Sequence, residues 1–374
     1  MRPRGSVYMH WAKQHAAAPY NLANSGLLGC ELADLELGPP DLLLNGPNAN
    51  GFQPLLEAIG ERYGVAAPRV VHAAGTSGAN FLAFAALVEP GDEVLVEQPT
   101  YEPLLAALAW LGARLRRFRR RFADGYAWDP DAVRAELAAA GGRVRLLVLT
   151  NPHNPSGIRA GTAAVAEIGA LAEQWGARVL VDEVYNDTWD DGAGPPSHVH
   201  LGPHFVATSS LTKCYGLSSL RCGWVLAEPA LAERMRRLHD FMAATLPMPS
   251  DSLALAAFRQ LPRLAARGRA LLEPNRQLIR DFLAAHRGWL DAVLGERAMM
   301  VFPRLLREDD SQLLHDRLRR RQTSIVPGRF FDEPRHFRLG FAVRTADVAF
   351  GLRHLGEALQ DDREPRSEPP DGSG

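Results

Sequence analysis

The sequence has little lysine: Lys13 and Lys213 are the two lysines in 374 residues, although lysine and arginine together number 42. It also has only three cysteines, which are too few and too scattered for a disulfide framework or a paired-cysteine metal site. His198 and His200 lack further ligands at zinc-site spacing, so we expect no metal. What must be explained instead is why lysine is retained at position 213.

Long hydrophobic runs and net charge are lacking as well. No apolar stretch approaches the ~20 residues of a membrane span, and the first residues have no signal-peptide core. The formal net charge of −1 argues against nucleic-acid and membrane-surface partners. One local basic run, the five arginines within residues 116–121, is interpreted as a solvated face. We therefore expect a soluble, cytoplasmic protein.

Lys213 lies among small, hydroxyl and apolar side chains, with no acid near it in sequence. A guanidinium stays protonated, whereas a desolvated lysine can lose its proton and attack a carbonyl. Ser210, three residues earlier, and Arg221, eight residues later, supply a hydroxyl and a permanent cation, which suit a phosphate monoester. Against the alternative of a solvated surface lysine, the neighbours favour a Schiff base with a phosphate-bearing aldehyde.

This stretch resembles the lysine motif of the fold-type I pyridoxal-phosphate enzymes, the class I/II aminotransferase family, in which Ser-x-[Ser/Thr]-Lys is followed eight residues later by Arg. The resemblance extends over residues 45–345 and implies pyridoxal 5′-phosphate as cofactor, held by Ser210, Lys213 and Arg221. Lys213 is then also the catalytic base.

An acid and a phenol follow a buried strand at residues 178–182. Asp182 ends the strand, and a buried acid needs a partner. The protonated pyridinium nitrogen of the cofactor is such a partner, which makes Asp182 catalytic and cofactor-binding; a helix cap is the alternative. The resemblance assigns Tyr185 to the cofactor's phenolic oxygen, with simple packing as its alternative.

Two further turns match the family motifs. Asn-Pro-x-Asn-Pro-Ser-Gly at residues 151–157 forces a turn, and the resemblance places Asn154 against the phenolic oxygen and the substrate. The glycine-containing turn at residues 74–80 opens a helix, where backbone N–H groups favour an anion. We expect its phosphate donors to be Gly78, Ala79 and Asn80. Tyr101 matches the residue that stacks on the cofactor ring, with core packing as the alternative.

Substrate contacts are expected near both ends of the chain. Arg338 lies in an alternating apolar strand where burial requires an anion, and the family uses an arginine there to bind the α-carboxylate. The segment 20–26, which contains Gly26, is expected to line the substrate side. Arg304 near the substrate would favour acidic amino acids, although a surface position explains it equally. One departure is that Asn45 or Gly46 stands where family members often carry a tyrosine that reaches the neighbouring subunit's phosphate.

Apolar strands near residues 93–97, 144–149, 178–182, 204–208 and 222–226 alternate with helical runs, which indicates an α/β fold. The family implies a large domain with a mixed, mostly parallel central sheet flanked by helices, plus a smaller α+β domain built from both chain ends. We expect the large domain at residues 46–272, the small domain at 1–45 and 273–360, and a disordered tail at 361–374.

These patterns predict a homodimeric aminotransferase that moves an amino group between an α-amino acid and a 2-oxo acid. A lyase, cyclase or oxidase remains open, because each begins by removing the same Cα proton. A ligand-sensing transcription regulator is disfavoured, because the first 45 residues carry no basic helix-turn-helix pattern.

Overall fold

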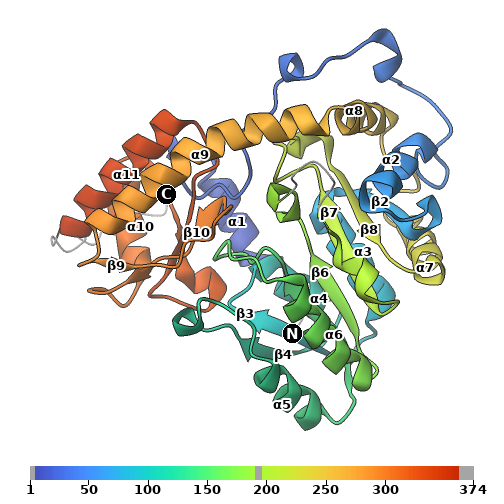
Figure 1. The fold of residues 1–374 in the computed structure, drawn as a ribbon, viewed down its shortest axis with the longest axis horizontal. Coiled ribbons are helices and arrows are strands. Elements are labelled where there is room, and N and C mark those ends of the chain that lie inside the picture. Colours follow the sequence, from blue (N-terminus) through green and yellow to red (C-terminus); the bar gives the residue numbers. More distant parts are fainter. Residues whose placement is uncertain (1–4, 190–195, 362–374) are drawn as a thin grey trace, which may run out of the picture.

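A seven-stranded sheet forms the centre of the computed structural model, which describes residues 5–189 and 196–361 (Figure 1). β8 is antiparallel to both of its neighbours, and the other neighbouring pairs are parallel. From edge to edge the strands are β2 (Val70–Ala74), β8 (Cys222–Leu226), β7 (Phe205–Ser210), β6 (Arg178–Asp182), β5 (Val144–Thr150), β3 (Glu93–Gln98) and β4 (Arg114–Arg119). The predicted α/β fold with a mixed, mostly parallel sheet is confirmed.

The side chains of successive strand residues point to opposite faces of this sheet, as the two-residue period of a strand requires. Val94 and Val96 pack in the cluster that includes α3 (Gly75–Leu87) and α7 (Pro229–His239), with α4 (Glu102–Trp110) on the same face. Leu95 packs instead in the cluster that includes α5 (Pro130–Ala140) and α6 (Thr162–Gln174). Because both faces are covered, the central strands β5 and β6 are largely apolar along their length.

Two strands of the central sheet, β2 and β4, are absent from the sequence-based expectations. The arginine run lies in β4 and just beyond it, so its interpretation as a solvated face is wrong for Arg120, which is 2 % exposed. In this strand Arg116, Arg117 and Arg119 form ion pairs with Glu93, Asp332 and Glu333, respectively. Arg120 instead turns inward, where it meets a buried carboxylate.

The N-terminal residues 20–21 join the C-terminal third of the chain in the smaller part of the molecule, which carries short sheets (Figure 1). Tyr20 and Asn21 of β1 (Tyr20–Asn21) pair in parallel with β12 (Thr323–Ser324). The other strands are β9 (Leu290–Asp291), β11 (Arg304–Leu305), β10 (Met300–Val301), β13 (Val326–Pro327) and β14 (Phe337–Gly340). The helices here are α1 (Val7–Gln14), α10 (Ser311–Arg319) and α11 (Thr345–Gln360).

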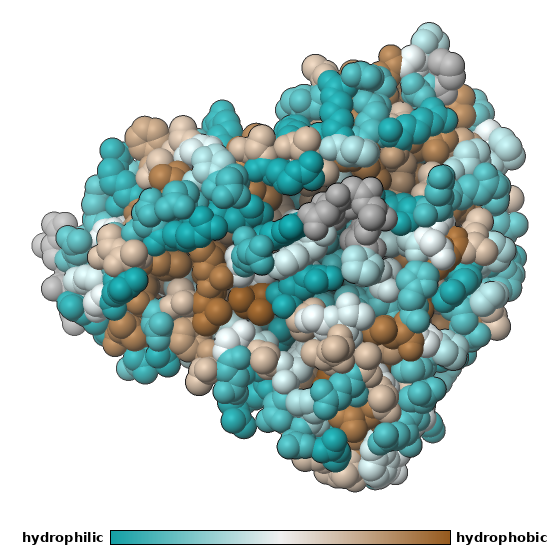
Figure 2. All heavy atoms as spheres, viewed as in Figure 1, coloured by the Kyte–Doolittle hydropathy of each residue, from teal (hydrophilic) through white to brown (hydrophobic). Residues whose placement is uncertain are grey.

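A single long helix, α9 (Leu261–Ala285), connects the two parts, and the expected boundary at 272–273 falls inside it (Figure 1). The remaining helices, α2 (Gln53–Tyr63) and α8 (Met248–Phe258), pack against each other beside the sheet. Hydrophilic side chains cover most of the face in Figure 2, with hydrophobic atoms gathered between the small and large parts. Within the described ranges, no helix is both long and apolar enough to cross a membrane. The expected tail lies outside the described residues except for Asp361.

Candidate active site

The first turn of α3 is an open anion site. β2 ends at Ala74 and the helix begins at Gly75, so the amide N–H groups of Gly75, Thr76 and Ser77 have no intrahelical partner. Gly75 has φ +70°, and a Cβ there would lie 2.2 Å from a guanidinium nitrogen of Arg221. Glycine is therefore what allows this cation to lie against the helix start, where the dipole also favours an anion.

Two side chains complete the anion site. Arg221 donates to the carbonyls of Ala74 at 3.1 Å and Ser218 at 3.0 Å, which hold its guanidinium at the helix start. The Thr76 hydroxyl donates to Ser210 Oγ at 2.7 Å. Open amides, hydroxyls and a guanidinium around one point form the donor set that a phosphate dianion needs.

The structure differs from the sequence expectation for Gly78, Ala79 and Asn80. Because α3 already begins at Gly75, these three residues lie in its second turn, where the amides have helical partners. The Asn80 side chain has another position: its Nδ2 donates to Asp182 Oδ2 at 2.8 Å, while its Oδ1 accepts from the Thr208 hydroxyl at 2.6 Å. The helix start, one turn earlier, supplies the open donors.

Asp182 ends β6 and is 4 % exposed. Besides the bond from Asn80, its Oδ1 accepts from the amide of Val184 at 3.1 Å. Burial raises the pKa of Asp182 to about 6, against which the bond from Asn80 acts most strongly. An acid held this way, without a cation bonded to it, suits a protonated ring nitrogen.

Lys213 lines a cavity of about 250 Å³, which we call the first cavity. Asp182, Tyr185, Asn154 and Arg221 line it as well. The lysine Nζ donates to Ser25 Oγ at 3.0 Å. Burial, and next the charge of Arg338, lower the pKa of Lys213 to about 8, so a larger fraction of the amine is neutral near physiological pH than in an ordinary lysine, while the protonated form still predominates. The Tyr185 hydroxyl is buried and makes no hydrogen bond to another described residue.

Arg338 is fully buried in β14, and its hydrogen bonds go to neutral acceptors. Nη1 donates to Asn154 Oδ1 at 2.9 Å, and Nη2 donates to the Tyr8 hydroxyl at 2.7 Å and the Ala23 carbonyl at 3.1 Å. Its Nε has no partner among the described residues. A buried cation without a counter-ion is costly, so this geometry is suited to receive a carboxylate.

Two other expected residues line this region. Tyr101 lines both the first cavity and a second cavity beyond Lys213. Its hydroxyl contacts Met9 Sδ at 3.2 Å. Gly26 packs against the lysine stem, where a Cβ would lie 3.4 Å from Lys213 Cδ. Residues 45–46 stand where family members often carry a tyrosine. At Gly46 an added Cβ would lie 2.8 Å from Met248 Cε.

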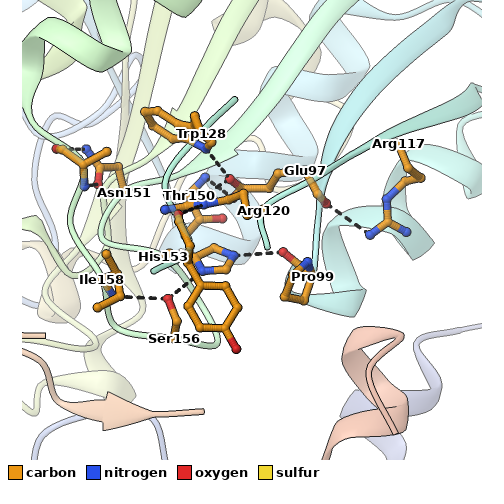
Figure 3. Close-up of polar contacts among 12 residues, drawn as sticks. Glu97, Pro99, Arg117, Arg120, Trp128, Thr150, Asn151, His153, Ser156 and Ile158 are labelled. Carbon is orange, nitrogen blue, oxygen red and sulfur yellow. Dashed lines mark hydrogen bonds and ion pairs between the residues drawn. The ribbon is translucent and has the colours of Figure 1, made fainter. Parts of the chain in front are cut away.

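Figure 3 shows a buried ion pair between Glu97 and Arg120 that was not predicted from the sequence. Glu97 accepts from Arg120 Nη1 and Trp128 Nε1, both at 3.0 Å, and from the Thr150 amide at 2.6 Å. Beside it, His153 bonds the Pro99 carbonyl at 2.9 Å. These contacts tie the ends of β3 and β5 together just before Tyr101 and Asn154. An acid closing an apolar strand, as Glu97 does, is the signal that predicts a buried partner.

The comparisons with known proteins agree with this geometry. Residues 38–355 match the model of the family described as aminotransferase class I and II. The chain belongs to this family. The match covers most of the chain, so the family's pyridoxal-phosphate-dependent fold type I applies to this enzyme as a whole.

Three relatives of this aminotransferase-family enzyme are informative. It is 29 % identical over 286 residues to capreomycidine synthase from Streptomyces vinaceus, covering 76 % of this chain and 73 % of that one. It is 29 % identical over 324 residues to arginine–pyruvate transaminase from Pseudomonas aeruginosa, covering 82 % and 80 %. A pyridoxal-phosphate-dependent aminotransferase from Streptococcus suis superposes with a TM-score of 0.88 at 24 % identity, covering 97 % and 99 %.

The cofactor of this family member is pyridoxal 5′-phosphate, and the described residues fit it. The glycine at position 75 leaves room at the helix start that a Cβ would fill, and Arg221 lies against it. The lysine, the buried acid and the unpartnered Tyr185 hydroxyl share one cavity. Phosphate, ring nitrogen and phenolic oxygen would each meet a group of matching chemistry.

Proposed function

We propose that this enzyme is an aminotransferase that moves an amino group between an α-amino acid and a 2-oxo acid. The observation that carries the proposal is that a half-buried lysine lies near a buried arginine, Arg338, which has no acidic partner among the described residues. One amine able to exchange protons and one cation able to bind a carboxylate are what an α-amino acid requires. The relative named arginine–pyruvate transaminase supports the same reaction class.

Each residue has a role in this proposal. When bound, pyridoxal 5′-phosphate supplies an aldehyde and an electron-withdrawing ring. Lys213 Nζ removes the proton from the substrate Cα and returns one during transfer, because its lowered pKa lets it act as both base and acid. Asp182 keeps the ring nitrogen protonated. Tyr185 and Asn154 donate to the phenolic oxygen, and Arg338 holds the α-carboxylate.

The phosphate contacts are proposed at the helix start. The amides of Gly75, Thr76 and Ser77, with the Ser210 hydroxyl and the Arg221 guanidinium, would bind the phosphate of the cofactor. Tyr101 would pack on the ring. Gly26 would leave space beside the lysine stem for the substrate.

A second candidate is a cyclase, lyase or oxidase reaction on an amino acid. The relative named capreomycidine synthase favours it. All of these reactions need the same Cα proton removal by Lys213, so the residues around the cofactor serve both. What separates them is the product.

We further propose a cytoplasmic homodimer, with a large domain at residues 46–272 and a small one at 1–45 and 273–360. Large apolar side chains are exposed at Leu44 (72 %) and Phe241 (88 %), and the Asn48–Leu246 hydrogen bond of 2.8 Å joins their two segments. Such a patch suits a second copy of the chain. The three free cysteines suit a reducing compartment. Size-exclusion chromatography with light scattering tests the dimer.

The deciding experiment follows the visible absorption band of the loaded enzyme while single amino acids are added. Transamination predicts that the band falls, that a 2-oxo acid appears, and that a second oxo acid restores the band. Lys213→Ala should abolish the change and Lys13→Arg should preserve it. A cyclised or eliminated product with no restorable aminated cofactor would refute transamination in favour of the second candidate.

A further inference from the structure

A second cavity of about 200 Å³ lies beyond Lys213 and is bordered by the N-terminal segment. Lys213, Tyr101 and Met9 line both this cavity and the one that contains Asp182 and Arg221. We call it the side-chain cavity. Its wall is formed by Tyr8 and Trp11 on one face of α1, by His15 at the C-terminal cap of that helix, and by the segment 21–25.

Its position follows from the two anchors of an amino acid, and this step rests on the proposed function. The amino group must meet the aldehyde at Lys213, and the carboxylate must meet Arg338. Tyr8 and Ala23, which both bond Arg338, also line the side-chain cavity. Because the cofactor would occupy the first cavity, the remaining large substituent on Cα, which is the substrate side chain, would occupy the side-chain cavity.

The walls of the side-chain cavity offer no charge matched to an ionic side chain. Apart from Lys213, the described residues that line it include no aspartate, glutamate, lysine or arginine. Arg304 would favour acidic substrates if it lay near the substrate. It lines neither of these two cavities, and its Nη2 donates to Asp291 Oδ2 at 3.0 Å. Burying an unpaired carboxylate or guanidinium is costly, so the walls disfavour acidic and basic side chains.

Most polar groups on the wall are already engaged. Asn21 bonds the Ala16 carbonyl and the Ala23 amide, both within 3.1 Å. Asn24 bonds the backbone of Gly26 at both ends of its amide, at 3.1 Å. Ser25 Oγ accepts from Lys213. These amides and this hydroxyl hold the segment in shape and leave little hydrogen bonding for a ligand.

His15 is the exception. Its ring stacks on Trp11, with centroids 4.5 Å apart and planes at 20°. Its Nδ1 lies 2.7 Å from the Trp11 carbonyl, which can only accept, so Nδ1 carries the proton and Nε2 of the neutral ring is an acceptor. The wall therefore combines aromatic faces with one acceptor nitrogen.

We propose that the side-chain cavity selects an uncharged, ring-sized substrate side chain, and that Trp11 of α1 and His15 at its C-terminal cap are the residues that select it. Trp11, Tyr8 and Tyr101 supply apolar faces for a ring. His15 Nε2 accepts a hydrogen bond from a hydroxyl or N–H group on that ring. The substrate class is thus aromatic amino acids with a polar edge, rather than acidic or basic ones.

The test measures binding of non-reacting carboxylic acids to the loaded enzyme by isothermal titration calorimetry, which is independent of turnover. The probes are 3-(4-hydroxyphenyl)propionate, 3-phenylpropionate, glutarate and 5-guanidinopentanoate. We expect both ring acids to bind at least about 10-fold more tightly than the two ionic acids. Tighter binding of glutarate or 5-guanidinopentanoate would overturn the proposal.

Two variants locate the selectivity. His15→Phe keeps the stack on Trp11 but removes the acceptor, so it should weaken only the hydroxyphenyl acid, by about 2- to 10-fold. His15→Glu should raise affinity for 5-guanidinopentanoate about 10-fold, while His10→Glu on the exposed side of α1 should not. Unchanged probe preference in His15→Glu would refute the role of His15.

Failure of the proposed function has a different signature. The amino-acid site itself is misassigned if no amino acid changes the absorption band and, in addition, either none of the four acids binds or Arg338→Gln leaves their binding unchanged. If the acids bind through Arg338 but in the wrong order, the amino-acid site stands and the side-chain class is wrong.

Discussion

Replacing Glu97 removes the carboxylate that faces the buried guanidinium of Arg120. Both side chains have no exposed surface, and their closest N–O distance is 3.0 Å. Glu97→Leu would leave the charge of Arg120 uncompensated, which costs about 3–5 kcal/mol. It would also strip a partner from Trp128 Nε1 and from the Thr150 amide, at about 1–3 kcal/mol each.

That sum is comparable to the whole stability of a domain, about 5–15 kcal/mol, so the measurement should use a milder change. Glu97→Gln keeps the shape and one acceptor oxygen but removes the charge, and we expect it to cost about 3 kcal/mol. The double variant Glu97→Leu/Arg120→Met should be more stable than Glu97→Leu alone, because no buried charge remains. Asp131→Asn, which disrupts an exposed i,i+3 pair with Arg134, is the control and should cost less than about 1 kcal/mol.

Urea unfolding followed by far-UV circular dichroism gives the free energy of unfolding of each variant. The wild type, Glu97→Leu, Arg120→Met and the double variant form a double-mutant cycle that gives the coupling energy between Glu97 and Arg120. A cost below about 1 kcal/mol for Glu97→Gln would refute the reasoning. So would a double variant that is less stable than Glu97→Leu, because the stranded charge would then not be the source of the loss.

Three other predictions follow from the pKa shifts and the arginine site. Incorporation of pyridoxal phosphate into the cofactor-free protein should rise with pH through about 8, because the pKa of Lys213 is lowered to that value and the neutral amine attacks; borohydride trapping and mass spectrometry should locate the label on Lys213 and not on Lys13. Arg338→Gln should raise KM for amino acids about 10- to 100-fold in steady-state assays, while leaving amines without a carboxylate unaffected. Burial, and next His15, lower the pKa of His315 to about 3, against about 6.5 when unfolded, so the unfolding free energy should fall as pH drops below 6.5, by at most about 1.4 kcal/mol per pH unit; His315→Gln should flatten that acid limb in urea unfolding.

Strands that are uniformly apolar were predictable from sequence. The expected strand at residues 144–149 matches β5 within one residue, because burial on both faces selects a continuous apolar run. β4 was not predictable in the same way. Its arginines mimic a solvated surface, and the sequence alone does not show that Arg120 turns inward to a carboxylate from another strand.

The site divides in the same manner. Lys213, Asp182 and Arg338 stand out because their charged side chains conflict with their apolar surroundings, whereas Asn154 stands out because its turn motif matches that of the family. The start of α3 does not, because it depends on Gly75 taking φ +70° beneath Arg221, a residue far along the chain. A boundary set by a distant side chain leaves no local pattern, so the sequence placed the expected phosphate donors at residues 78–80, one turn after the observed helix start.

By itself the sequence determined the fold class and the identity of the chemical groups, because strand burial, turn residues and one isolated lysine are local properties of the chain. Only the tertiary structure decided how those groups are placed. It brought Asn80 to Asp182, gave Arg338 neutral hydrogen-bond acceptors and no acid among the described residues, and placed α1 beside a second cavity next to Lys213. The physical reason is that charge compensation and cavity shape depend on contacts between residues distant in sequence, which no short segment encodes.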